Sequence, residues 1–127
     1  MRIHEPFPGV LAFYEGRDGT RHAEGANWVD DGALSLGIAS YAILSGDQAL
    51  VYDCHLSPDR ARLIRDTLAA RGARRFTVIL SHWHIDHVAG TEPFADCEII
   101  ANPRTLAHLT REKAALETGT YAGPPAI

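Results

Sequence analysis

The stretch that decides the fold is SHWHIDHVAG, residues 81–90. It places His82, His84 and His87, three of the seven histidines in the chain, beside the carboxylate of Asp86. Imidazole nitrogen and carboxylate oxygen are the ligands that zinc and other borderline divalent metals take, and a tight cluster of them lowers the entropic cost of assembling a site. The stretch therefore predicts a metal-binding loop.

The spacing of the four residues indicates how they share metals. If His82 and His84 continue an extended strand, their side chains fall on one side of the backbone and can hold one ion. Asp86 and His87 are adjacent, so we expect them to diverge toward a second ion a few ångströms away. A catalytic zinc takes three protein ligands and a water, so two such sites need about six ligand contacts. The motif alone supplies half a site.

Strand patterns precede the motif. Apolar residues occur at both odd and even positions of the stretch 75–80. Because successive side chains of a strand point to opposite faces, this pattern predicts a strand that is covered on both faces. The motif leaves the carboxyl end of this strand, where open α/β sheets place their ligands. Residues 36–44 and 48–53 alternate around a central glycine and predict a β-hairpin, and residues 10–14 predict an earlier strand.

Helix signals separate these strands. Ser57, Pro58 and Asp59 suit the N-cap, the first position and the positive end of a helix that continues over residues 61–71. Further elements are expected along the rest of the chain: a short helix at 88–94, a strand at 98–101, and a helix from 102 to about 117. The order predicts an α/β sheet with helices on one side.

The pattern His82-x-His84-x-Asp86-His87 with Gly90, placed after a strand and a hairpin that ends in Asp53, resembles the N-terminal part of the metallo-β-lactamase superfamily over roughly residues 39–101. The resemblance implies an αββα sandwich that binds one or two metals at one sheet end. It implies that the first metal takes the first two histidines of the motif, and that the second takes the Asp-His pair.

The same resemblance gives a role to the turn after the hairpin. Asp53 matches an aspartate of the family, which would accept a hydrogen bond and so orient a metal-bound histidine. An aspartate that simply caps a loop is the alternative. The turn here is Asp53-Cys54-His55 and lacks the family's glycine. His55 is a candidate pocket residue, although we expect a solvated side chain.

The remaining ligands of such a site come from later in the family's chain. His108 is the one histidine after the motif, and we expect it to be an ordinary side chain on a helix rather than a ligand. Residues 1–127 are therefore expected to form a single incomplete domain, the N-terminal half of the sandwich. A C-terminal half, on a further segment or chain, would supply more His and Asp ligands and cover an apolar sheet face.

The function that the resemblance implies is metal-dependent hydrolysis. One or two zinc ions, with iron or manganese as other candidates, would activate water for attack on an ester, thioester, lactone, amide or phosphodiester of a small molecule. Asp86 would hold or orient that water as the catalytic residue. An iron-dependent redox enzyme and a non-catalytic metal-binding or scaffold protein are the alternatives.

Composition narrows the partners and the location. The 12 basic and 16 acidic residues give a net charge of −4, which argues against nucleic acid as the partner. The first eight residues lack the apolar core of a secretory signal, and no apolar run approaches the ~18 residues of a membrane span. We expect a cytoplasmic protein, capable of forming an oligomer, with Cys54 and Cys97 as small buried residues and no disulfide.

Overall fold

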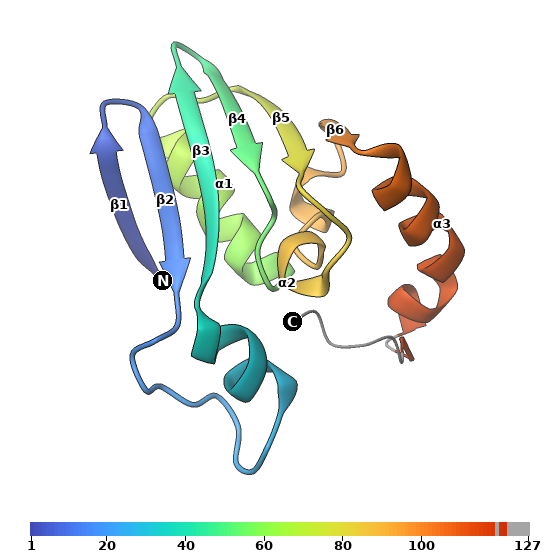
Figure 1. Cartoon of the computed structure of the whole chain (residues 1–127). Helices are drawn as coiled ribbons and strands as arrows, with labels where there is room; N and C mark the ends of the chain where they lie inside the picture. Colours follow the sequence, from blue (N-terminus) through green and yellow to red (C-terminus); the bar gives the residue numbers. More distant parts are fainter. Residues whose placement is uncertain (119, 122–127) are drawn as a thin grey trace.

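A six-stranded sheet forms the centre of the computed structural model, which describes residues 1–118, 120 and 121. The strands lie side by side in the order in which they occur in the sequence (Figure 1). They are β1 (Arg2–Phe7), β2 (Val10–Glu15), β3 (Ile38–Ser45), β4 (Gln48–Tyr52), β5 (Arg75–Leu80) and β6 (Glu98–Ala101).

The sheet is antiparallel from β1 to β4 and parallel from β4 to β6. The predicted hairpin is confirmed as β3 and β4, which turn at Gly46 with a φ of 59°. Because β4 and β5 are parallel, their carboxyl ends meet at one edge of the sheet. The turn after β4 and the histidine-rich motif after β5 therefore lie together at that edge.

The crossover from β4 to β5 is α1 (Pro58–Ala70), which packs on one face of the sheet (Figure 1). Ser57 is its N-cap, and the Ser57 Oγ accepts a hydrogen bond from the Arg60 N–H at 3.4 Å, as the sequence predicts. The helix buries Ala61, Ile64 and Leu68 against apolar strand residues and forms the main core.

Two predictions about elements are corrected. β1 was not expected, and all six of its side chains are exposed, so this edge strand carries no alternation of apolar and polar residues. The short helix expected at 88–94 is divided into α2 (Ile85–Val88) and the single turn η2 (Glu92–Phe94). The helix thus begins inside the metal-binding motif. The last helix is confirmed as α3 (Pro103–Thr118).

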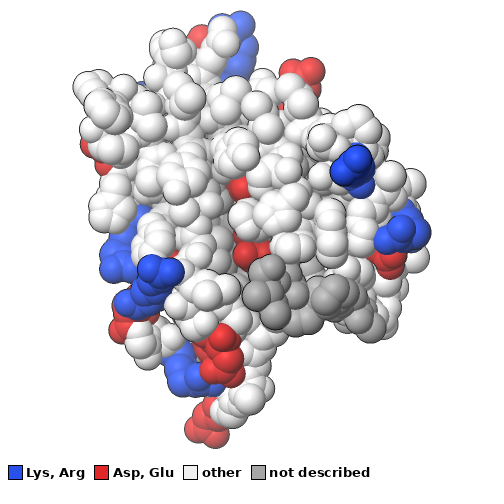
Figure 2. All heavy atoms as spheres, viewed as in Figure 1, with Lys and Arg blue, Asp and Glu red and all other residues white. Residues whose placement is uncertain are grey.

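The face of the sheet opposite α1 is open. Register aligns Tyr41, Tyr52, Ile79 and Ile100 in one row across β3, β4, β5 and β6. Of these side chains, 48% of Tyr41, 40% of Tyr52 and 46% of Ile100 are exposed, and neighbouring Ile43 is 53% exposed. Figure 2 shows this side of the molecule, with uncharged atoms over its middle and most charged residues toward its edges.

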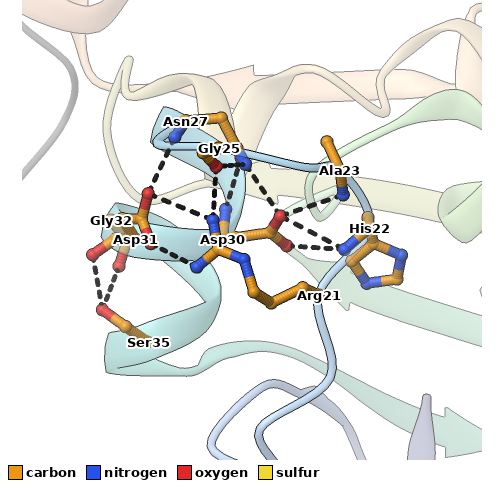
Figure 3. Close-up of polar contacts among 9 residues, drawn as sticks. All are labelled: Arg21, His22, Ala23, Gly25, Asn27, Asp30, Asp31, Gly32 and Ser35. Carbon is orange, nitrogen blue, oxygen red and sulfur yellow. Dashed lines mark hydrogen bonds and ion pairs between the residues drawn. The ribbon is translucent and has the colours of Figure 1, made fainter.

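The connection between β2 and β3 contains η1 (Val29–Leu34) and is held by polar contacts. The buried carboxylate of Asp30 accepts hydrogen bonds from the backbone N–H groups of His22 and Ala23 and from Asn27 Nδ2, the last at 2.8 Å (Figure 3). The sequence of this segment lacks a periodic apolar pattern, and hydrogen bonds of polar side chains hold it instead.

The structure also describes the two cysteines and the helices that could be tested as membrane spans. Both cysteines are free, Cys54 is buried, and Cys97 is half-buried. Among residues 1–118, 120 and 121, each helix is too short or too polar to cross a membrane.

Candidate metal centre

The motif forms a cluster of imidazoles at the carboxyl edge of the sheet. Its backbone leaves β5, stays extended at His84, and then enters α2, where the His84 carbonyl accepts hydrogen bonds from the N–H groups of His87 and Val88. The ring of His82 lies 4.4 Å from that of His84 and 4.1 Å from that of His87, centroid to centroid. The rings of His84 and His87 therefore both lie against the ring of His82.

The expected divergence of Asp86 and His87 is wrong. His87 Nε2 lies 3.4 Å from Asp86 Oδ2, so the two side chains approach each other. Adjacent side chains are about 100° apart around a helix but point to opposite faces of a strand. Because α2 begins at Ile85, this pair follows the helical spacing.

Asp53 joins two of the histidines in one hydrogen-bonded chain. Its Oδ2 accepts from His87 Nδ1 at 2.7 Å and from Ser81 Oγ at 2.7 Å, while its Oδ1 accepts from the Ser81 backbone N–H at 2.8 Å. Since the single hydroxyl proton of Ser81 is used on Asp53, Ser81 Oγ accepts from His82 Nδ1, 2.8 Å away. His82 thus keeps Nε2 for a ligand, whereas His87 Nε2 already lies 3.4 Å from Asp86 Oδ2.

The sequence identifies Asp53 as a residue that orients a histidine of the motif, but it does not identify Ser81. A serine at the end of a strand carries no signal of its own, and its contact depends on the parallel pairing of β4 with β5. Asp53 itself has a φ of 65° and is 2% exposed. Its backbone N–H donates to the Ile79 carbonyl at 2.9 Å. This hydrogen bond fixes the backbone that carries the carboxylate next to the end of β5.

The pKa values of the three imidazoles shift in different directions. Burial lowers the pKa of His82 and of His84, and the neighbouring His87 lowers both further. Burial also lowers the pKa of His87, but its hydrogen bonds to Asp53 and Asp86 outweigh that effect and raise the pKa to about 9. Burial raises the pKa of Asp86, but the hydrogen bond and charge of His87 together with the nearby His84 outweigh burial, so the net shift of the pKa is downward.

Asp86 provides the test of whether the residues fit a metal. Its Oδ1 is buried and has no hydrogen-bond partner among residues 1–118, 120 and 121, which costs a carboxylate oxygen about 1–3 kcal/mol or more. A cation beside Oδ1 removes that cost, and the surrounding imidazoles are the matching donor type. The chemistry of the donor set therefore fits a divalent metal.

The donors do not yet form a complete coordination sphere. Over residues 1–118, 120 and 121, no three His, Cys, Asp or Glu side chains converge closely enough to hold one ion. The cluster contains the four donors of the motif. A full metal site requires further donors.

His55 is buried, so the expectation of a solvated side chain is wrong. It is 0% exposed, because its neighbours Cys54 and Leu56 belong to two different apolar clusters and draw the residue between them inside. Within the described part of the chain, neither ring nitrogen has a hydrogen-bond partner, and burial lowers the pKa of the imidazole to about 4.

Trp83 and Ile85, which alternate with His82, His84 and Asp86 in the motif, are not part of the main core. The Trp83 indole stacks on the imidazole of His108 in α3, with centroids 3.7 Å apart and planes 25° from parallel. Ile85 lines a groove of about 1030 Å³ between α2 and α3, opposite Leu109. His108 contacts Trp83 in this arrangement, and its assignment as a non-ligand stays a prediction.

These observations define an α/β fold with a metal-binding motif at the carboxyl edge of its sheet. The family model described as "Metallo-beta-lactamase superfamily" matches residues 35–110, which include every residue of the cluster. The chain belongs to the metallo-beta-lactamase superfamily.

Known proteins agree with this assignment over part of their length. An "Atrochrysone carboxyl ACP thioesterase" from Passalora fulva is 46% identical over 55 residues, which cover 42% of this chain and 16% of the thioesterase. Among solved structures, DIM-1 metallo-beta-lactamase is 17% identical with a TM-score of 0.70, and the mono-zinc form of FIM-1 from Pseudomonas aeruginosa is 12% identical with a TM-score of 0.67.

The two lactamase matches cover 88% of this chain, and 47% of DIM-1 and 46% of FIM-1. The chain thus spans about half the length of these structures. The predicted fold class is confirmed: the described residues form the N-terminal half of a metallo-β-lactamase-type sandwich.

Proposed function

We propose that this chain contributes His82, His84, Asp86 and His87 to the metal centre of a hydrolase that cleaves thioesters or related carboxylic esters. The buried Asp86 Oδ1, which lacks a partner beside three clustered imidazoles, is the observation that carries this proposal. The thioesterase relative from Passalora fulva supports the substrate class.

Each residue has a separate task in this proposal. A bound zinc, the metal named for FIM-1, lowers the pKa of a water and polarises the scissile carbonyl. His82 and His84 would hold one ion, with His87 and Asp86 toward a second. Asp53 fixes the ring of His87 directly and that of His82 through Ser81.

Asp86 is the residue placed to act on the attacking water. Its Oδ2 lies 3.4 Å from His87 Nε2, while its buried Oδ1 has no hydrogen-bond partner among the described residues. Its lowered pKa keeps it ionised, so it can accept a hydrogen bond from water and orient one lone pair of that water toward the substrate.

The open face of the sheet supports a second half of the fold as the partner. Exposed apolar side chains of β3, β4 and β6 lie on this face, namely Tyr41, Ile43, Tyr52 and Ile100, and soluble monomers rarely expose contiguous apolar surfaces beyond a few hundred Å². We propose that the C-terminal half covers this face and brings the outstanding His and Asp donors to the carboxyl edge.

Hydrolysis by the full-length protein tests the proposal. Zinc-loaded protein is expected to cleave an acyl thioester and a p-nitrophenyl ester in preference to a phosphodiester or a β-lactam. Asp86→Asn should lower kcat/KM by at least about 100-fold while leaving the fold intact. Asp96→Asn, which changes an exposed carboxylate paired with Arg65, is the control and should stay near wild type.

Three results would contradict this function. Fully metal-loaded protein that cleaves neither ester class removes the proposed reaction, and full activity in Asp86→Asn removes the role of that carboxylate. Iron in place of zinc in the purified protein, with oxygen consumption and no hydrolysis, favours the redox alternative.

A further inference from the structure

The three imidazoles of the cluster are not held in the same way. His87 and His82 are oriented through Nδ1, by Asp53 and by Ser81. Within the part of the chain that the structure describes, no hydrogen bond reaches the ring of His84. This ring must be kept in place by other contacts if it is to serve as a ligand.

Trp83 provides such a contact. The indole meets the His84 ring edge to face, with centroids 4.5 Å apart and planes at 87°. This T-shaped arrangement is a favoured geometry for aromatic pairs, because the positive ring edge meets the negative ring face. The His82 ring lies 4.4 Å away on another side, so His84 is bounded by two rings.

Trp83 is itself fixed by α3. Its indole stacks on His108 at 3.7 Å, and His108 is held at both nitrogens. Arg111 Nη2, which can only donate, lies 2.9 Å from His108 Nδ1, so the ring proton is on Nε2 and faces Tyr121 Oη at 3.4 Å. The chain of contacts therefore runs from α3 through Trp83 to His84.

We propose that the Trp83–His108 stack is a positioning device that holds His84 in its metal-binding orientation, so that α3 contributes to metal affinity without providing a ligand. This inference rests on the proposed metal site. It predicts that removal of the stack weakens metal binding while the fold, and the hydrogen bonds of the other two histidines, are retained.

Zinc affinity of the full-length protein, measured by competition with a chromophoric chelator, tests this inference. His108→Ala should weaken zinc binding by about 3- to 10-fold, the range expected when an aromatic pair is lost. His108→Phe keeps a flat ring on Trp83 and should bind within about twofold of wild type. Leu106→Ala shortens a 62% exposed side chain on the same helix and leaves the stack, so it is the matched control.

A spectroscopic measurement separates positioning from general stability. In cobalt-substituted protein, the visible absorption of the ion should change in His108→Ala and return toward wild type in His108→Phe, because it depends on the arrangement of the ligands. If His108→Ala does not fold, His108→Leu replaces it and keeps the apolar volume.

Unchanged zinc affinity in a folded variant without the ring overturns the inference. Equal losses in His108→Phe and His108→Ala also overturn it, since the ring stack would then be irrelevant. In both cases the wild-type protein still binds zinc. Wild-type protein that binds no zinc contradicts the proposed function instead, so the two failures are distinguishable.

Discussion

Asp53 shows how much of the centre depends on one buried side chain. Its carboxylate accepts three hydrogen bonds, from Ser81 at two atoms and from His87, and so links the end of β4 to the motif after β5. The residue adopts a positive φ of 65°, which aspartate tolerates better than most side chains. The turn works without the family's glycine because Asp53 and His55 adopt left-handed backbone conformations themselves.

His55 makes a pH-dependent contribution to stability. Its pKa is about 4 in the folded protein, below the ordinary value of 6.5, because the ring is buried. As the pH falls below 6.5, the unfolded chain therefore takes up a proton that the folded protein does not. The free energy of unfolding should fall by about 3 kcal/mol between the two pKa values, and no such loss occurs above them.

His55→Asn isolates this contribution. Asparagine does not titrate and tolerates a positive φ. Denaturant unfolding at about pH 7 and about pH 4.5 should show a drop in stability that is smaller in the variant by about 2–3 kcal/mol. Equal drops in the two proteins would show that the imidazole is not kept neutral by burial.

At the scale of elements, much of the arrangement could be predicted from the sequence. The hairpin, α1 with its Ser57 cap, β5 and α3 all carry local signals of alternation, capping or helical spacing. β1 carries none, since its side chains are all exposed. The contacts of Trp83 with His108 and of Asp53 with His87 join distant residues, and only the tertiary fold places them together.

The packing of the motif against the turn after β4 depends on Gly90. A Cβ atom at this position would lie 1.9 Å from the Cys54 carbonyl oxygen and 2.8 Å from the Cβ of Ala61 in α1. The backbone after α2 therefore packs directly on the turn after β4, where the Cys54 N–H also donates to the His87 carbonyl. This close approach holds the motif against the turn that contains Asp53.

Gly90→Ala should lower the free energy of unfolding by about 3 kcal/mol, because two segments of backbone must separate. Gly32→Ala is the matched control, since its added Cβ would meet the Trp28 ring at an ordinary distance of 3.5 Å and neither glycine needs a positive φ. Denaturant unfolding measures both. Similar stabilities of the two variants would contradict the close packing.

At the scale of the whole molecule, the two faces of the sheet differ. One face buries the core under α1, while the other exposes the row that includes Tyr41 and Tyr52. Sequence alternation identifies apolar residues on both faces of the sheet. Alternation does not reveal what covers the second face, so the partner stays a proposal.

Ile43→Ser tests that cover in the full-length protein. Ile43 on the open face and Leu63 on the outer side of α1 are similarly exposed here, at 53% and 46%. If a second half covers the sheet, Ile43→Ser should cost about 2 kcal/mol of stability and Leu63→Ser less than about 1 kcal/mol. Equal costs would indicate that the face is open to solvent in the intact protein.

The metal content of the purified full-length protein tests the central claim most directly. Elemental analysis should find at least about one equivalent of zinc per chain in the wild type and background levels in the His82→Ala, His84→Ala double variant. Circular dichroism should show that the variant keeps its folded structure. The same metal content in both proteins would contradict the assignment of these imidazoles as ligands.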